Sequence, residues 1–212
     1  MLKALLLVLE PVTTWNKIFL ARRGFAFILL LHLIPLLLVT SVCEGYGLVR
    51  WGKQRGQMQE VSHLKPFTRG EAVLFESAQF LLSLVLVFAG AHMVKSIGET
   101  FHGRHTYTQA FAAVAYGLSP LFLLRLLDTF PSVNPWVPWT IGILLSIGAM
   151  YHGLPRMLEP DPAHAFGLFL IGSLLLALVS GLLRFVTWWY LLGKLPQVET
   201  FVSDLAARLP FQ

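Results

Sequence analysis

Five long apolar stretches, separated by shorter polar segments, constrain the fold of this 212-residue chain more than any other feature. Each stretch approaches the length of about 20 residues that an α-helix needs to cross about 30 Å of hydrocarbon. Hydrophobic residues make up 56% of the sequence and charged residues only 13%, unlike a soluble domain. The sequence therefore predicts an all-α membrane protein with five transmembrane helices. The predicted spans are 25–43, 72–97, 108–129, 135–154 and 165–192.

Two terminal segments flank this predicted membrane domain (residues 25–192). Residues 1–24 carry too short an apolar run for a signal peptide. We expect them to form a retained interfacial arm, with Trp15 at the level of the headgroups. Residues 193–212 predict a C-terminal amphipathic helix. The apolar faces expected to contact lipid are Leu5, Leu6, Leu9 and Ile18 in the arm and Val198, Phe201, Val202, Leu205 and Leu209 in the C-terminal helix.

The basic residues flank the apolar stretches and give a formal net charge of +5. In this setting they favour contact with membrane lipids, anionic headgroups included, and no basic stripe with interleaved aromatic residues indicates nucleic-acid binding. A five-span topology divides Lys and Arg equally between its two sides, so the positive-inside rule does not orient the chain. Cys43 cannot form an intrachain disulfide because it is the only cysteine.

Small residues recur at spacings of three or four in the last two spans. Such stripes let helices approach closely in lipid. We interpret them as packing within one bundle, with homo-oligomerisation as the alternative. The stripes are Ser173, Ala177 and Gly181 in the fifth span, and Gly142, Ser146, Ala149 and Gly153 in the fourth.

Polar and ionisable residues inside the spans form the next signal. Glu76 and Gln79 share a helix face because they lie three residues apart. The preferred interpretation is that Glu76, near its helix end, reaches water. The alternative is a network with Arg125 or Arg184, which a five-span topology places toward the same side of the membrane. Such a network would orient helices or, less readily, serve transport.

Five histidines fall at span ends or in loops that share one side of the predicted bundle: His92, His102, His105, His152 and His164. The spacing of His102 and His105 is typical of metal ligands, and His152 and His164 could join them with Glu99, Glu159 and Asp161. Because these loops are exposed, we interpret the histidines as solvated, with no bound metal. The sequence also lacks a Walker loop, a Gly-x-Ser-x-Gly elbow, a dinucleotide fingerprint and Cys-x-x-Cys. We therefore expect neither a cofactor nor enzymatic activity.

Two short motifs carry a resemblance to a known family. Ala115-Tyr116-Gly117-Leu118-Ser119-Pro120 lies in the third span, and Tyr151-His152-Gly153-Leu154-Pro155 closes the fourth. Together with Glu10-Pro11, Trp15 and Ile18, they resemble the Yip family of Ypt/Rab-interacting membrane proteins. Independently of the family, Pro120 predicts a kink, Gly117 a close helix approach, and Tyr116 a hydroxyl that satisfies a carbonyl freed by the kink.

The resemblance implies five spans with a cytoplasmic N-terminus and the C-terminus on the far side. Eukaryotic relatives bind prenylated Rab-type GTPases. The short arm before the first span argues against a small GTPase partner here and favours a prokaryotic member in the cell (inner) membrane. Two hypotheses follow. The chain is a non-enzymatic organiser of lipids or of partner membrane proteins, or it is a small transporter or channel that uses Glu76, Arg125 and Arg184.

Overall fold

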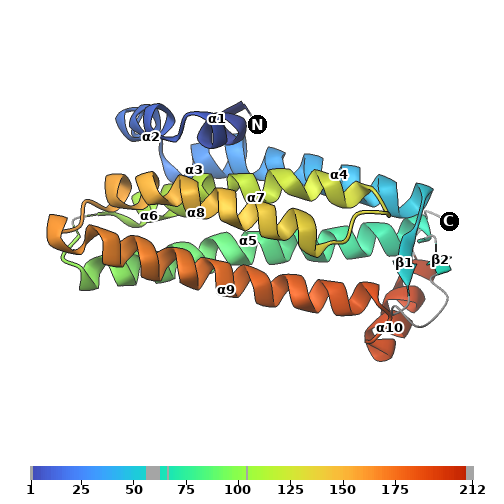
Figure 1. Ribbon diagram of the computed structural model, residues 1–212. Helices are drawn as coiled ribbons and strands as arrows, with labels where there is room; N and C mark the ends of the chain where they lie inside the picture. The colour runs from blue at the N-terminus through green and yellow to red at the C-terminus, as the bar shows by residue number, and fades with distance from the viewer. Residues whose placement is uncertain (1, 56–62, 66, 104, 209–212) are drawn as a thin grey trace.

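The computed structural model describes residues 2–55, 63–65, 67–103 and 105–208, which form an elongated helical bundle (Figure 1). Among them, five helical segments are long and apolar enough to cross a membrane. The predicted fold class, an all-α membrane bundle of five spans, is therefore confirmed. The five segments are Phe25–Arg50, Arg69–Thr100, Tyr107–Thr129, Trp136–Leu158 and Pro162–Leu191.

The first span combines helix α3 (Phe25–Ile28), a π-helical turn (Leu29–Leu33) and helix α4 (Ile34–Arg50). Pro35 lies in the first turn of α4, where its missing N–H breaks no bond within that helix. Helix α4 continues past the predicted end of the span at Cys43, so Glu44 lies in the helix and not in the polar loop where sequence reasoning placed it.

The second span is helix α5 (Arg69–Thr100), which begins with a capping box. The Thr68 hydroxyl accepts a hydrogen bond from the Glu71 amide, and the Glu71 carboxylate accepts one from the Thr68 amide. This pairing satisfies helix-end donors and fixes the start of α5.

The third span breaks near its middle. Helix α6 (Tyr107–Gly117) ends and helix α7 (Ser119–Leu124) begins around Pro120, and a 3-10 turn (Arg125–Thr129) closes the span. The break removes the usual acceptor of the Leu121 amide, which donates instead to the Ser146 hydroxyl at 3.2 Å. A neighbouring helix thus satisfies the backbone at the kink, as a membrane interior requires.

The last two spans are helix α8 (Trp136–Leu158) and helix α9 (Ala165–Leu191), joined by a 3-10 turn (Pro162–His164). Their small residues face neighbours within the chain. A Cβ at Gly142 would lie 2.9 Å from the Leu121 Cα, and one at Gly181 would lie 3.2 Å from the Trp139 ring. The stripes therefore provide close packing inside the bundle, with Ser173 buried and Ala177 packed against the core.

The two ends of the bundle differ. One, the hairpin end, carries the antiparallel strands β1 (Lys53–Arg55) and β2 (His63–Lys65) and helix α10 (Pro196–Ala207). The other, the histidine end, includes residues 101–103 and 105–106 and the link 159–164 (Figure 1). Helix α10 packs through Ala206 against Gly70. Its apolar side chains Val198, Phe201 and Leu205 are exposed, Val202 is partly buried, and Leu209 lies outside the described residues.

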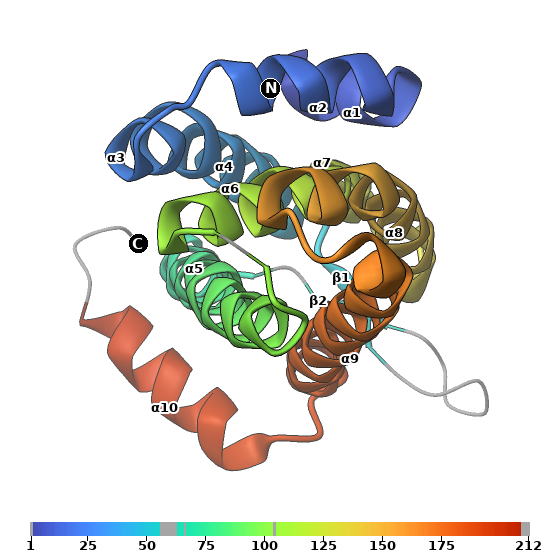
Figure 2. The ribbon, with the colours of Figure 1, turned by 90° about the vertical axis from the view of Figure 1, so that its left-hand side faces the viewer.

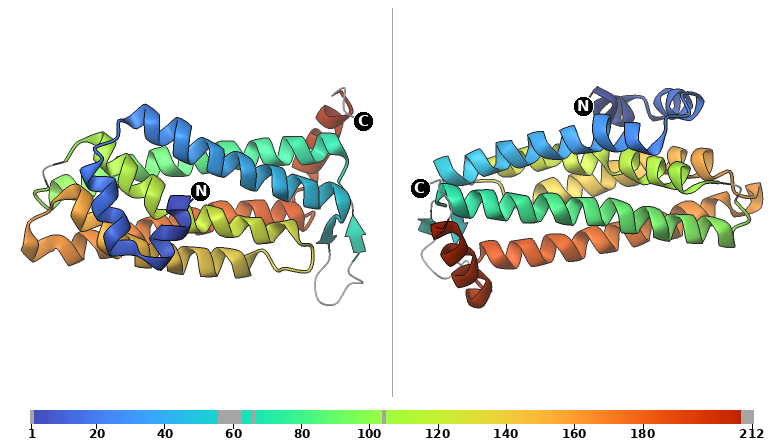
Figure 3. Two further views of the ribbon diagram at one scale, coloured as in Figure 1. Left: turned by 90° about the horizontal axis from the view of Figure 1, so that it is seen from above. Right: turned by 180° about the vertical axis from the view of Figure 1, so that it is seen from behind.

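The N-terminal arm is a pair of short helices, α1 (Leu2–Leu9) and α2 (Pro11–Leu20), that lies across the outside of the bundle (Figures 2 and 3). Leu5 and Leu9 are exposed as expected, but Ile18 and Trp15 are buried. The Trp15 indole packs directly on Gly153 and donates to the Ala149 carbonyl at 2.7 Å. The prediction of Trp15 at headgroup level and Ile18 against acyl chains is therefore wrong, because small residues on α8 leave room for the indole.

Candidate functional site

Ionisable side chains cluster inside the half of the bundle next to the hairpin end. The Arg125 guanidinium, which follows α7, lies 2.8 Å from the Glu44 carboxylate on α4 and 3.1 Å from the Glu76 carboxylate on α5. Its Nε donates to the same Glu44 oxygen. All three side chains are buried, so this ion pair ties the first three spans together.

Two further polar groups complete this cluster. Gln79 donates to the second Glu44 oxygen at 3.2 Å, so both oxygens of that carboxylate are engaged. The Ser83 hydroxyl accepts a longer contact from Arg125 at 3.5 Å. Sequence reasoning named Glu76, Gln79 and Arg125 but missed Glu44. The signal was present, because Leu37, Ser41, Glu44 and Leu48 recur at helical spacing and form a buried face.

A second ion pair lies in the same half of the bundle. The Arg184 guanidinium on α9 bonds both oxygens of Asp128, at 2.7 and 2.6 Å. It also donates to the Pro135 carbonyl ahead of α8. Arg184 therefore pairs with Asp128 and not with Glu76, and it links the last three spans.

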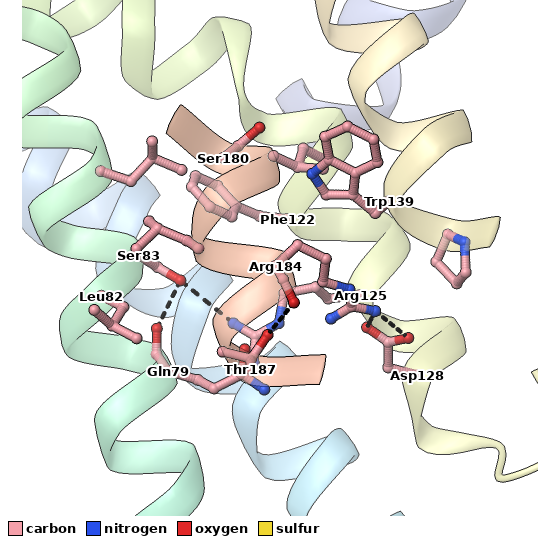
Figure 4. Close-up of a pocket in the computed structure, with 14 residues that line it drawn as sticks. Gln79, Leu82, Ser83, Phe122, Arg125, Asp128, Trp139, Ser180, Arg184 and Thr187 are labelled. Atoms are coloured by element: carbon pink, nitrogen blue, oxygen red, sulfur yellow. Dashed lines mark hydrogen bonds and ion pairs between the residues drawn. The ribbon is translucent and has the colours of Figure 1, made fainter. Parts of the chain in front are cut away.

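The two clusters face a small cavity of about 60 Å³ (Figure 4). The charged and polar side chains of its lining are those of Gln79, Ser83, Arg125, Asp128, Ser180, Arg184 and Thr187. The clusters hold three carboxylates and two guanidinium groups, so one negative charge is left over when all five groups are ionised. Paired charges are tolerated in a low-dielectric interior where isolated ones are not.

Glu76 occupies the least satisfied position of this set. It is 7% exposed, so the interpretation that it reaches water is wrong. Its Oε2 accepts from Arg125, but its Oε1 has no hydrogen-bond partner among the described residues. The Ser41 hydroxyl is also buried and unpartnered. Both residues line a groove between α4 and α5.

That groove, the α4–α5 groove, has a volume of about 700 Å³. Apolar side chains that are half or more exposed, such as Val42 and Leu81, form its walls. Arg69, at the first turn of α5, lines its hairpin end. The groove thus joins an apolar channel, a basic group near one helix end, and two unpartnered oxygens.

The kink in the third span carries its own polar cluster. The His32 imidazole lies 2.8 Å from the Ser119 hydroxyl and packs on the Tyr116 ring at a centroid distance of 4.2 Å. The Tyr116 hydroxyl has no hydrogen-bond partner among the described residues, so the prediction that it satisfies a freed carbonyl is wrong. Gly117 packs against Met150, where a Cβ would approach to 2.8 Å. His32 was not selected from the sequence, although a lone histidine in a span is a signal.

The second family motif lies in the last turns of α8, and three of its residues have different surroundings. Tyr151 is exposed and packs edge-on against Phe169. Gly153 lies under the Trp15 ring. Pro155 sits inside the helix, and its carbonyl accepts the Glu159 amide at 3.1 Å.

The histidines are spread over the histidine end without converging. His105 contacts the Lys95 carbonyl at 3.1 Å, and the exposed His164 lies 3.7 Å from Asp161. His102 is exposed, and His152 packs against the neighbouring Tyr151 ring. In the described part of the chain, no three His, Cys, Asp or Glu side chains lie close enough together to hold a metal ion.

Comparison with known proteins places this bundle in a family. The model of the Yip1 domain matches residues 5–185, from helix α1 through most of α9. No curated protein and no solved structure matches the chain. The matched range includes the buried arm, the kinked third span and both ion-pair clusters. The chain therefore belongs to the Yip family, as its motifs suggested, and is a multi-pass integral membrane protein.

Proposed function

We propose that this Yip family member is a non-enzymatic membrane protein that organises lipids, and that it holds a lipid in the α4–α5 groove. The groove carries the proposal. It runs between two spans, and its exposed apolar walls would face acyl chains in a bilayer. At the hairpin end, Arg69 stands where a lipid phosphate would lie.

The oxygens of Ser41 and Glu76 support occupation of this groove. The Ser41 hydroxyl lies next to the Glu76 carboxylate, but neither oxygen has a partner in close hydrogen-bond geometry among the described residues, so a polar group of a ligand would improve their hydrogen bonding. A lipid whose glycerol or headgroup region carries a hydroxyl or an amine would supply a donor for Glu76 Oε1. Partner membrane proteins and homo-oligomers are other occupants that the same exposed walls would accept.

Transport remains the second candidate because of the cavity beside Arg125 and Arg184. Its lining is partly polar, and the surplus carboxylate of the two clusters could carry a proton. A transporter, however, needs a polar site near the midplane with alternating access. Here the cavity is about 60 Å³, and both guanidinium groups are held by carboxylates.

Lipid co-purification and liposome flux distinguish these functions. Val42→Trp would fill the groove, and Val186→Trp places the same side chain at a similarly exposed position on α9. If the protein organises lipids, Val42→Trp should lose co-purified lipid that the parent and Val186→Trp retain. Glu76→Gln should then have the same liposome flux as the parent. A proton or solute flux that Glu76→Gln abolishes and Val42→Trp leaves intact would establish transport instead.

A further inference from the structure

A second pocket lies at the histidine end, far along the bundle from the α4–α5 groove. We call it the arm pocket. It has a volume of about 370 Å³ and is formed by the link between α2 and α3, the first part of α6 and the end of α8. Its polar lining consists of Arg22, Arg23, Thr106, Thr108, Gln109, Tyr116 and Glu159.

The Tyr116 hydroxyl lies beside the arginines of this pocket. The Tyr116 side chain is 0% exposed and lines the pocket, and no described residue meets its hydroxyl in close hydrogen-bond geometry. The Arg23 guanidinium is its polar neighbour and is near enough for a loose hydrogen bond. A phosphate oxygen between these two groups would accept from both of them.

Helix ends position two of the charged side chains. Arg22, with a φ of 39°, follows the C-cap of α2, and Glu159, with a φ of 45°, is the C-cap of α8. A left-handed residue at this place is a common way for a helix to end. Both residues line the arm pocket, so the end of the arm brings a cation to it and the end of α8 brings a carboxylate.

The charges of the pocket define the ligand. Neither Arg22 nor Arg23 forms an ion pair with a described carboxylate. Arg23 rests on the Phe27 ring at 4.3 Å, which holds it in place without neutralising it. Among the described residues of the lining, Glu159 is the one carboxylate and Arg22 and Arg23 are the cations, so the described lining has a net charge of +1.

We propose that the arm pocket binds the phosphodiester group of a membrane phospholipid. A phosphodiester carries one negative charge, matching the net charge of the pocket. Its oxygens accept from two guanidinium groups and from the Tyr116 hydroxyl. Glu159 then faces the hydroxyl or ammonium group at the far end of the headgroup. This proposal rests on the proposed function in one respect, namely that the protein binds lipids. It does not depend on the α4–α5 groove, because the two sites share no residue.

Short-chain lipids added to purified protein in detergent test the proposal by thermal shift and native mass spectrometry. Phosphatidylglycerol should bind and raise the melting temperature, and a digalactosyl lipid with the same chains should not. Arg22→Gln with Arg23→Gln should weaken the binding by about tenfold or more, and Tyr116→Phe by about fivefold. The phenylalanine variant without lipid should melt at or above the parent, because it loses only an unpartnered hydroxyl.

Two further arms identify the source of the phosphate and separate the two lipid sites. Glycerophosphoglycerol, which has the phosphodiester but no chains, should bind much more weakly than the lipid; equal binding with the same variant losses would assign the site to a soluble phosphodiester. All of these measurements use the Val42→Trp background, which fills the α4–α5 groove, so that the binding measured is that of the arm pocket. Equal phosphatidylglycerol binding by the parent and the arginine double variant, or equal binding of the digalactosyl lipid by the parent, would overturn the proposal. Loss of lipid in Val42→Trp alone concerns the groove and leaves the arm pocket standing.

Discussion

The arginines at the two ends of the bundle differ in burial and in their partners. Toward the hairpin end, Arg125 and Arg184 are each held by carboxylates from other helices, at distances between 2.6 and 3.1 Å. At the histidine end, Arg22 and Arg23 have no carboxylate partner among the described residues. One end pairs its arginines with carboxylates inside the bundle, and the other leaves two arginines beside the arm pocket without such partners.

This difference changes which residues are expected to carry function. Ionisable residues within spans are functional candidates by default, and they drew attention to Glu76, Arg125 and Arg184. Their pairing favours a structural role, since the two clusters join groups from all five spans. The polar atoms without a close hydrogen-bond partner include those of Ser41 and Glu76, which line the α4–α5 groove, and of Tyr116, which lines the arm pocket, so they lie beside the two proposed lipid sites.

The largest expected effect comes from breaking the hairpin-end cluster. Arg125→Met would leave Glu44 and Glu76 buried without a counter-charge, which should destabilise the fold by about 3–5 kcal/mol. Unfolding in mixed micelles measures this effect. Arg50→Met, at an exposed position on α4, is the matched control and should be nearly neutral. Equal stability of the two variants would show that the cluster does not hold the spans together.

A smaller effect is expected where the arm docks. Gly153→Val forces the Trp15 ring off α8, and overpacking of this kind costs about 1–3 kcal/mol. Limited proteolysis and quenching of tryptophan fluorescence should report release of the arm. Gly148→Val lies on the same helix with nothing within 4 Å of its new Cβ, and it should keep the arm protected. Similar protease sensitivity in both variants would refute docking through Trp15.

The next prediction concerns the kink in the third span, which lies between the two ends of the bundle. Ser146→Ala leaves the Leu121 amide without an acceptor and should cost about 1–2 kcal/mol. Thr140→Ala removes an exposed hydroxyl that bonds only its own helix, and it should cost less than about 0.5 kcal/mol. Hydrogen exchange at Leu121 should accelerate only in the Ser146 variant. Unchanged exchange there would mean that another group satisfies the amide.

The smallest effect is expected at Glu76. A glutamine retains an oxygen for Arg125, and its new amide faces the unpartnered Ser41 hydroxyl, so the stability should change by less than about 1 kcal/mol. Glu44→Gln should destabilise more, because both Glu44 oxygens are engaged. Unfolding of the two variants side by side gives this ranking. A reversed order would make Glu76 the main anchor of Arg125.

The sequence by itself determined the membrane class, the five spans and the break near Pro120. These properties depend on sums over neighbouring residues, because hydrocarbon thickness sets the length of an apolar run and a missing amide breaks the local helix wherever the helix packs. The small-residue stripes could also be predicted from the sequence, since the spacing of the small residues places them on one helix face. The family motifs added the family, which the match over residues 5–185 confirms.

Tertiary structure alone decided which polar groups meet. Arg125 bonds Glu44 across 81 positions of sequence, and Trp15 bonds Ala149 across 134. Arg184 pairs with Asp128 and not with Glu76, and the N-terminal arm packs through Trp15 on α8. Each outcome depends on the rotation and depth of one helix against another. A change of one residue in register turns a side chain by about 100° around the helix axis, so hydropathy, which predicts that a span exists, leaves its partners undetermined.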